Sequence, residues 1–208
     1  MERLEELSHT KHNHTRGDYL YRCGDRFDSL YAIRSGSFKT YLLDEDGREQ
    51  VTAFQMAGEI IGLDAISSDK HTCDAVAMEN SEVCELPFTK LESLSREIPS
   101  LQHHLHKIMS REIVRDQGIM LLLGSMSAEE KLAAFLLNLS QRFASRCLSP
   151  TEFTLRMSRQ EIGGYLGLQI ETISRTFSLL QQRGIININL KDVEILELEG
   201  LRACLKST

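Results

Sequence analysis

Three polar side chains in the stretch GYLGLQIETISRTF have the types and spacing of a group that reads nucleic-acid bases. Glu171, Ser174 and Arg175 lie i, i+3 and i+4 apart, so a helix would place all of them on one face. An arginine can donate two parallel hydrogen bonds to O6 and N7 of guanine, and a glutamate can accept one from N4 of cytosine. Four residues apart, the two could serve one G·C pair, while the small serine lets the helix approach a neighbouring base. The simpler alternative is an intrahelical ion pair between Glu171 and Arg175 on a solvated face.

The charge around this trio favours DNA over a simple ion pair. The chain of 208 residues carries 30 acidic and 24 basic side chains, and its net charge of −6 gives no support to nucleic-acid binding by the molecule as a whole. Between residues 141 and 185, however, six arginines outnumber Glu152, Glu161 and Glu171. A positive patch in a negative protein is what contacts with phosphate groups require.

The overall composition, 41% hydrophobic and 26% charged, is that of a globular protein. The sequence contains neither a long apolar run nor a signal peptide, which predicts a cytoplasmic protein that does not enter a membrane. Its five cysteines are odd in number, widely scattered and never arranged as C-x-x-C. This arrangement argues against both a disulfide framework and a zinc finger.

Residues 15 to 88 consist of short strand-like runs separated by glycines, with a hairpin signal at Asp46-Gly47. Many short strands at even spacing are typical of a small antiparallel barrel or jelly roll. The pattern changes to helices after Pro87, where Thr89 and Glu92 have the spacing of a capping box.

A long helix is expected from about residue 99 to 123, with Gly124 as its C-cap. It carries two apolar stripes, of which the first would pack within its own subunit (Leu101, Leu105, Ile108, Ile119 and Leu122). The second follows the alternating three- and four-residue spacing of a coiled-coil seam and predicts a symmetric dimer. The alternative is a single helix that is buried on several sides. The predicted seam consists of His106, Met109, Ile113, Asp116, Met120 and Leu123.

Capping boxes that begin at Ser127 and Ser158 predict two further helices. The second of these would end at Gly167, and another helix would run from Ile170 until Gly184 ends it. Residues 185–198 then read as a β-hairpin. Two helices joined by a short turn containing glycine, followed by a hairpin, have the layout of a winged helix-turn-helix.

Motifs along nearly the whole chain resemble those of the CRP/FNR superfamily, and specifically its FNR-type branch of oxygen-responsive regulators. They are LYAIRSGSFKTY, EQVTAFQMAGEIIGLDAI, SEVCELPF, EEKLAAFLLNLSQRF, MSRQEIGGYLGL and ETISR. The resemblance implies an α+β chain with an N-terminal β-roll sensor of the cyclic-nucleotide-binding type at 1–88. A dimerisation helix region at 89–124 and a C-terminal winged helix-turn-helix at 125–208 would follow.

The resemblance also assigns roles to residues of the helix-turn-helix. Glu171, Ser174 and Arg175 would read double-stranded DNA with TTGAT-like half-sites arranged as a palindrome. We expect contacts with the DNA backbone, or support of the helix-turn-helix, from Ser158, Arg159, Gln169 and Thr172. The implied protein is a homodimeric transcription regulator, not an enzyme, which activates or represses by contacting RNA polymerase.

The β-roll is not expected to bind cyclic AMP. Family members that do so use a Gly-Glu pair followed by an Arg-Ser pair. Gly58 and Glu59 match the first pair, but His71-Thr72-Cys73 stands where the arginine is needed. Without the arginine a buried phosphate lacks its charge-assisted partner, so Gly58 and Glu59 are expected to be structural.

Cys84 resembles the internal ligand of the [4Fe–4S] cluster in FNR-type proteins, where an N-terminal cysteine-rich segment supplies the other three thiolates. The chain begins at MERLEEL, downstream of the matching segment. Two explanations stay open: a fragment that lacks the cluster-binding extension, or a protein that has lost the cluster. In the second case Cys84 is a small apolar strand residue. We expect the cluster in an intact protein and no cofactor bound by this chain alone.

Asp116 on the seam would bring two carboxylates together at the two-fold axis and weaken the dimer. Alternatively, its side chain reaches solvent or meets the partner's Arg115. The histidines at 9, 12, 14, 103, 104 and 106 lack ligand spacing and are not expected to bind metal.

Two rival functions remain for the sequence. A sensor of heme or an organic ligand on the same scaffold would need an axial ligand, for which His71 is the candidate. A cupin-type enzyme would need two or three histidines and a glutamate at strand positions, but residues 15–88 contain His71 alone, so this class nearly fails on the sequence.

Overall fold

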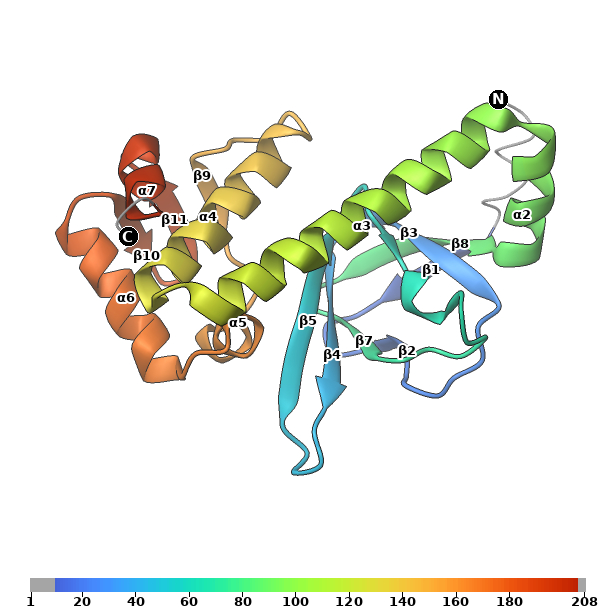
Figure 1. The fold of residues 1–208 in the computed structure, drawn as a ribbon, viewed down its shortest axis with the longest axis horizontal. Helices are drawn as coiled ribbons and strands as arrows, with labels where there is room; N and C mark the ends of the chain where they lie inside the picture. Colours follow the sequence, from blue (N-terminus) through green and yellow to red (C-terminus); the bar gives the residue numbers. More distant parts are fainter. Residues whose placement is uncertain (1–9, 206–208) are drawn as a thin grey trace. The chain divides into compact units, whose positions relative to one another are not determined.

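The computed structural model describes residues 10–205, so His9 lies outside the described residues. The chain forms two compact units, residues 1–115 and 116–208, and the boundary falls within the long helix α3 (Pro99–Ser125) (Figure 1). The α+β fold class expected from the sequence is confirmed. The three-part division at residues 88 and 124 stays a prediction.

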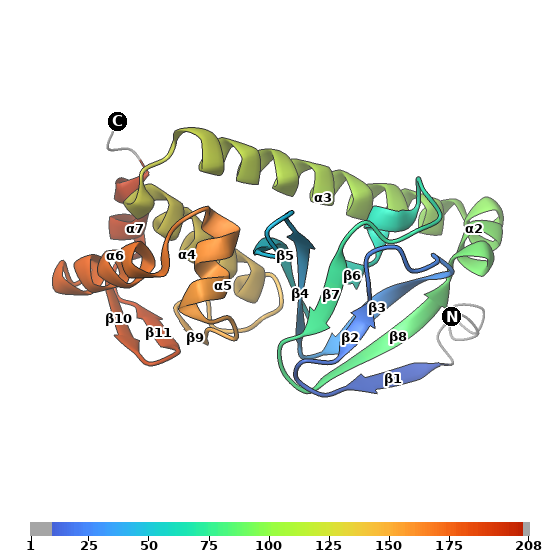
Figure 2. The ribbon, with the colours of Figure 1, turned by 90° about the horizontal axis from the view of Figure 1, so that it is seen from below.

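The first unit contains two four-stranded sheets whose neighbouring strands are all antiparallel (Figure 2). The strand orders are β1-β8-β3-β6 and β2-β7-β4-β5. The first of these strands begins before residue 15, where the predicted strands began. The strands are β1 (Lys11–His14), β2 (Tyr19–Tyr21), β3 (Ser29–Ser35), β4 (Ser37–Leu43), β5 (Glu49–Met56), β6 (Ile60–Ile61), β7 (Asp74–Ala77) and β8 (Ser81–Pro87), with a 3-10 turn η1 at Leu63–Ala65.

The core of the roll is filled by side chains that alternate along both sheets. Ile33 and Val83 come from one sheet, and Phe38 and Ala75 come from the other. All are nearly inaccessible to solvent. Because successive side chains of a strand point to opposite faces, this alternation fixes the register of each strand.

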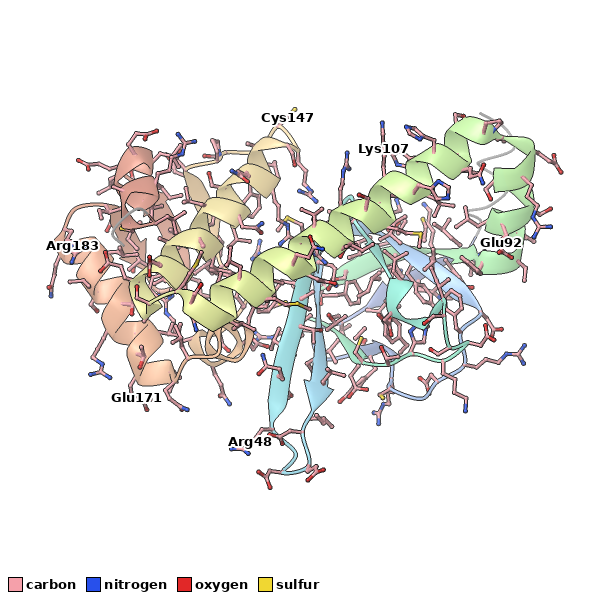
Figure 3. All side chains as sticks on the ribbon, in the orientation of Figure 1. Arg48, Glu92, Lys107, Cys147, Glu171 and Arg183 are labelled. Atoms are coloured by element: carbon pink, nitrogen blue, oxygen red, sulfur yellow. The ribbon has the colours of Figure 1, made fainter. Side chains whose placement is uncertain are left out.

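The predicted hairpin at Asp46-Gly47 is confirmed as the β4–β5 turn. Gly47 has a φ of 76° and donates its backbone N–H to the carbonyl of Asp44 at 2.9 Å. At the same turn Arg48 pairs with the carboxylates of Asp44 and Asp46, and Figure 3 shows it at the tip of the hairpin.

The capping box predicted at Thr89 is wrong. Helix α2 (Phe88–Glu97) begins two residues earlier than a cap at Thr89 implies, and its N-cap Pro87 makes no side-chain hydrogen bond. The backbone N–H of Phe88 donates to the carbonyl of Asp28 at 3.0 Å. This tertiary hydrogen bond sets the start of the helix, so a side-chain cap is not needed.

The end of α3 also differs from the prediction, because the helix passes Gly124 and ends at Ser125. Ser125 donates its hydroxyl to the carbonyl of Leu121 at 3.2 Å, and Lys131 donates its Nζ to that of Leu123 at 3.3 Å. These donors satisfy carbonyls of the last turn, which removes the need for a left-handed glycine cap.

The first apolar stripe of α3 behaves as predicted where it lies beside the roll. Leu101 and Leu105 pack against a buried cluster that includes Leu30 and Leu91. Leu122, further along the stripe, is buried in the second unit.

The second unit packs four helices with a three-stranded antiparallel sheet of order β10-β11-β9 among the described residues. The predicted capping boxes at Ser127 and Ser158 are both present. The sequence did not predict the last helix, α7. The elements are α4 (Ala128–Ala144), β9 (Glu152–Thr154), α5 (Arg159–Leu166), α6 (Ile170–Gln182), β10 (Ile186–Asn189), β11 (Asp192–Ile195) and α7 (Leu198–Cys204).

Gly36, in the turn between β3 and β4, packs closely against Ser81. Its φ is 80°, and a Cβ there would lie 2.1 Å from Oγ and 2.7 Å from Cα of Ser81. We expect Gly36→Ala to lower the free energy of unfolding by about 3 kcal/mol, from left-handed strain and overpacking, in urea titrations. Gly17, at φ 92°, faces open space, so Gly17→Ala should cost only the strain, about 1–2 kcal/mol. Equal losses in the two variants would contradict this account.

Candidate nucleic-acid interface

Helices α5 and α6 form the expected helix–turn–helix. Ser158 caps α5 by accepting from the backbone N–H of Glu161 at 3.2 Å, while the Glu161 carboxylate accepts from Ser158 N at 2.7 Å. The helix ends at Gly167, whose φ of 63° is the left-handed conformation that glycine adopts without strain. Gln169 is the N-cap of α6 and makes no side-chain capping bond.

A second glycine allows the turn to fold back on α5. A Cβ on Gly163 would lie 2.5 Å from the carbonyl oxygen of Leu168, and the Gly163 carbonyl accepts from the N–H of the C-cap residue Gly167. The Leu168 N–H donates to the Gly163 carbonyl at 2.9 Å. This close backbone approach fixes where α6 begins relative to α5.

The inner face of α6 is buried, and the trio singled out from the sequence lies on the opposite face. Ile173, Phe177 and Leu180 are nearly inaccessible to solvent. In contrast, Glu171, Ser174 and Arg175 are all exposed. The side chain of Glu171 projects outward from the first turn of α6 (Figure 3).

The alternative interpretation of the trio, an ion pair within the helix, is not what the described residues show. Arg175 donates its Nε to the backbone carbonyl of Glu171 at 3.4 Å, and no ion pair joins the two side chains in residues 10–205. A guanidinium so placed keeps most of its donors for an external acceptor.

Arg159 supports α6 from the start of α5. The centre of its guanidinium lies 3.4 Å from the centroid of the Phe177 ring. Burial lowers the pKa of Arg159, and its Nη1 is buried without a hydrogen-bond partner in the described structure. A flat cation on an aromatic face is attracted to the ring and packs well. Thr172, on α6, accepts at its carbonyl from the Thr176 hydroxyl at 2.8 Å.

Lys131 is a supporting residue that the sequence reasoning missed. Its side chain is largely buried and donates to the Leu123 carbonyl at the end of α3. A Cβ on Gly167 would lie 3.2 Å from Cδ2 of Leu123, so the last turn of α3 contacts the turn of the helix-turn-helix. A lysine directly before the apolar run LAAFLL was the available signal.

The arginines of the positive patch predicted for residues 141–185 are not equally available to DNA in the structure. Arg183 is engaged by Glu129 at 2.5 Å. The exposed face of the three-stranded sheet carries Glu152, Asp192 and Glu194 around a shallow hollow. Phosphate groups would be repelled from that face, which leaves the α6 side of the unit as the surface suited to DNA.

The predicted dimer seam is exposed along α3. Met109, Ile113 and Met120 are 39%, 58% and 72% exposed, and His106 and Asp116 are also exposed. Val114 and Leu121, both 62% exposed, lie seven residues apart beside the seam and were not included in the prediction. The uncovered apolar band is therefore wider than a strict heptad stripe.

Gly58 and Glu59, the pair that the sequence matches to the cyclic-nucleotide site of other family members, lie between β5 and β6. Gly58, with a φ of 87°, donates to the carbonyl of Ile33 at 2.8 Å. The Glu59 carboxylate accepts from Met56 N at 3.0 Å. Both residues shape the turn between β5 and β6.

His71 is held by neighbours in the core of the roll. Its ring stacks on Tyr21 with centroids 3.5 Å apart, and its Nδ1 lies 3.4 Å from the Asp64 carboxylate. It is 3% exposed. This packing leaves little room for the axial ligation of a heme.

Cys84 lies in β8, paired in register with Lys11 and Ala32, and its side chain is buried. Within residues 10–205 no group of three or more histidine, cysteine or acidic side chains is arranged to hold a metal ion. The described residues therefore do not fit a four-thiolate cluster, which Cys84 could serve with one ligand only.

Comparison with known proteins agrees with this architecture. Residues 11–97 match the cyclic nucleotide-binding domain model, and residues 130–204 match the Crp-like helix-turn-helix domain model. The chain is 46% identical over 202 residues to the transcriptional regulatory protein btr of Bordetella pertussis, covering 97% of this chain and 84% of that protein. It is 44% identical over 207 residues to the fumarate and nitrate reduction regulatory protein of Vibrio cholerae, covering 97% and 83%. The chain belongs to the CRP/FNR family of transcription regulators.

A solved structure supports the same assignment. FixK2 from Bradyrhizobium japonicum matches with a TM-score of 0.86 and 28% identity, covering 94% of this chain and 96% of that one. The protein is thus a DNA-binding transcription regulator of the FNR and Anr type, and its relatives are regulators, not enzymes. None of the described helices is long and apolar enough to cross a membrane.

Gly163 provides a test of the close approach that positions α6. We expect Gly163→Ala to destabilise the second unit by about 1–3 kcal/mol in thermal unfolding and to weaken DNA binding, because the new methyl group displaces the Leu168 carbonyl. Gly118→Ala is the control, since this glycine of α3 has open space around it and should gain about 1 kcal/mol of helix stability. Unchanged DNA binding by Gly163→Ala would argue against the constraint.

Proposed function

We propose that the protein binds TTGAT-like palindromes as a homodimer, with Glu171, Ser174 and Arg175 reading the bases. The observation that carries the proposal is the exposed trio on α6, whose opposite face is buried and whose acidic and basic members form no ion pair with each other. Two such helices related by a two-fold axis would enter major grooves one helical turn apart, which explains a palindromic site.

Within each half-site, Arg175 would donate to O6 and N7 of the guanine, and Glu171 would accept from N4 of the paired cytosine. Ser174 lets the helix approach and bonds a neighbouring base. Contacts with the DNA backbone, and support of the motif, would come from the start of α5 and the turn (Ser158, Arg159, Gln169 and Thr172).

Arg175→Ala is expected to weaken binding to the cognate duplex by about 1–3 kcal/mol, or roughly tenfold to a hundredfold. Fluorescence anisotropy would compare a TTGAT–ATCAA duplex with one whose central G·C pairs are changed. The variant should no longer discriminate between the two duplexes, because the bidentate contact is gone.

Arg202→Ala is the matched control, because Arg202 on α7 is an exposed arginine that pairs with Glu199 at 2.5 Å. It should keep both affinity and discrimination. If Arg175→Ala still preferred the TTGAT duplex by the wild-type ratio, Arg175 would not be a base reader.

The homodimer would form along the exposed seam of α3, where His106, Met109, Ile113 and Met120 flank Asp116. Two Asp116 carboxylates near the two-fold axis would repel each other and oppose association. The dimer would then be only marginally stable, so a small favourable free energy from another site would shift the monomer–dimer equilibrium.

Asp116→Ala should therefore strengthen the dimer, by a severalfold decrease in the dissociation constant for an interaction of about 1 kcal/mol. Sedimentation velocity over a concentration series measures this constant. Glu92→Ala removes an exposed carboxylate of α2, away from the seam, and should leave the constant unchanged. An unchanged or weaker dimer on Asp116→Ala would contradict this proposal.

For sensing, the relatives named for fumarate and nitrate reduction suggest an iron–sulfur cofactor. We propose Cys84 as one ligand of a [4Fe–4S] cluster in an intact protein that responds to oxygen or redox state. The described residues do not supply the remaining thiolates, so specific DNA binding by this chain should be the same with and without air. Binding that is lost in air would instead place a working oxygen sensor in these residues.

The protein would act in the cytoplasm and regulate transcription through contacts with RNA polymerase. A heme or organic ligand in the roll is the weaker alternative, because the packing of His71 between Tyr21 and Asp64 disfavours it.

A further inference from the structure

Cys23 and Cys73 lie at the ends of two neighbouring strands of the roll. Strands β2 and β7 are antiparallel, and Tyr21 pairs with Ala75. Cys23 lies two residues after the end of β2, in a turn that the hydrogen bond from Asp25 N to the Arg22 carbonyl closes at 3.0 Å, and Cys73 directly precedes β7. The two cysteines are therefore at the same end of this strand pair.

Backbone hydrogen bonds show that the two segments stay side by side beyond the strand ends. Gly24 N donates to the His71 carbonyl at 2.8 Å, and His71 N donates to the Asp25 carbonyl at 2.9 Å. An isolated antiparallel bridge joins Arg26 to Lys70, so the segments that carry the two cysteines are adjacent on both sides of the Cys23 turn.

Cys23 contacts the residues directly before and directly after Cys73 in the chain. The Cys23 thiol donates to the Thr72 carbonyl at 3.5 Å, and Cys23 N donates to the Asp74 carboxylate at 2.7 Å. A disulfide needs Cα atoms about 4.4–6.8 Å apart, a separation that residues on two adjacent, hydrogen-bonded segments can reach.

The two thiols differ in access to solvent. Cys23 is exposed, whereas Cys73 is buried with 7% exposure. Burial first, and then the nearby Asp64 carboxylate, raise the pKa of Cys73 to about 12. An oxidant in solution would thus meet Cys23 first, and Cys73 would react second.

We propose that Cys23 and Cys73 are a redox-active thiol pair that a peroxide converts into an intramolecular disulfide. The Cys23 thiolate attacks the peroxide O–O bond and becomes a sulfenic acid, with hydroxide leaving and taking up the thiol proton as water. The Cys73 sulfur then attacks the Cys23 sulfur, and the S–OH oxygen leaves as a second water with the Cys73 proton. Two thiols are oxidised by two electrons in total, and one hydrogen peroxide is reduced to two waters.

This site is independent of the DNA-reading helix and of any cluster at Cys84. Formation of the disulfide would draw the Cys73 sulfur toward Cys23, next to the half-buried Asp64 carboxylate, which accepts from the Tyr21 hydroxyl at 3.2 Å and from Thr72 N at 2.8 Å. Oxidation would therefore change the packing of side chains inside the roll as well as the exposed thiol of Cys23.

The test is peptide mapping of the full chain, reduced and then treated with a small excess of hydrogen peroxide, with free thiols blocked after denaturation. The expected product is lighter by the mass of two hydrogen atoms, contains a cross-linked pair of peptides bearing Cys23 and Cys73, and reverts on reduction. Cys23→Ser should abolish the cross-link. Cys147→Ser, which removes an exposed cysteine of the second unit, should leave it intact.

The proposal is overturned if Cys23 proceeds to its sulfinic acid while Cys73 stays a free thiol, or if Cys23 forms its bond with another cysteine. Because the mapping is done on the wild-type chain, a folding defect in a variant does not affect the result.

Discussion

Burial of one side of α6 fixes the direction in which its other side points. Ile173, Phe177 and Leu180 leave almost no surface exposed, and this burial holds the helix against the rest of its unit. Fully burying each such side chain is worth about 1.5–3 kcal/mol. Rotating α6 enough to turn Arg175 inward would expose this apolar face, so the outward position of the base-reading residues is a consequence of core packing. The glycines at 163 and 167 then set where the helix begins.

Most of the second unit could be predicted from the sequence because its signals are local. Ser158 and Gly167 mark the limits of α5 through contacts within a few residues. Where the prediction failed, a distant partner decided the outcome. The carbonyl of Asp28 sets the start of α2, and Lys131 helps to satisfy the end of α3 in place of a glycine cap. The exposure of Val114 was also missed, since a strict heptad count passes over it.

The distribution of charge reconciles a net charge of −6 with a DNA-binding function. Carboxylates gather on the exposed face of the β9–β11 sheet, and arginines lie around the helix-turn-helix. In the first unit, three residues singled out from the sequence make structural contacts. Gly58 and Glu59 stabilise a turn, and His71 is stacked in the core. The β-roll of the family is thus present, and the sequence places His71-Thr72-Cys73 where cyclic-nucleotide-binding members use an arginine.

The central claim is that Arg175 reads the guanine of the half-site, and a double-mutant cycle with modified DNA tests it most directly. Replacing the guanine with 7-deazaguanine removes the N7 acceptor and keeps base pairing. We expect this change to weaken binding of the wild-type protein by about tenfold, which is the loss expected for one contact of a bidentate pair. It should not weaken binding of the Arg175→Ala variant any further, because the arginine that contacts N7 is already gone. Equal losses for the two proteins would contradict the account, because the guanine N7 would then be recognised by another group.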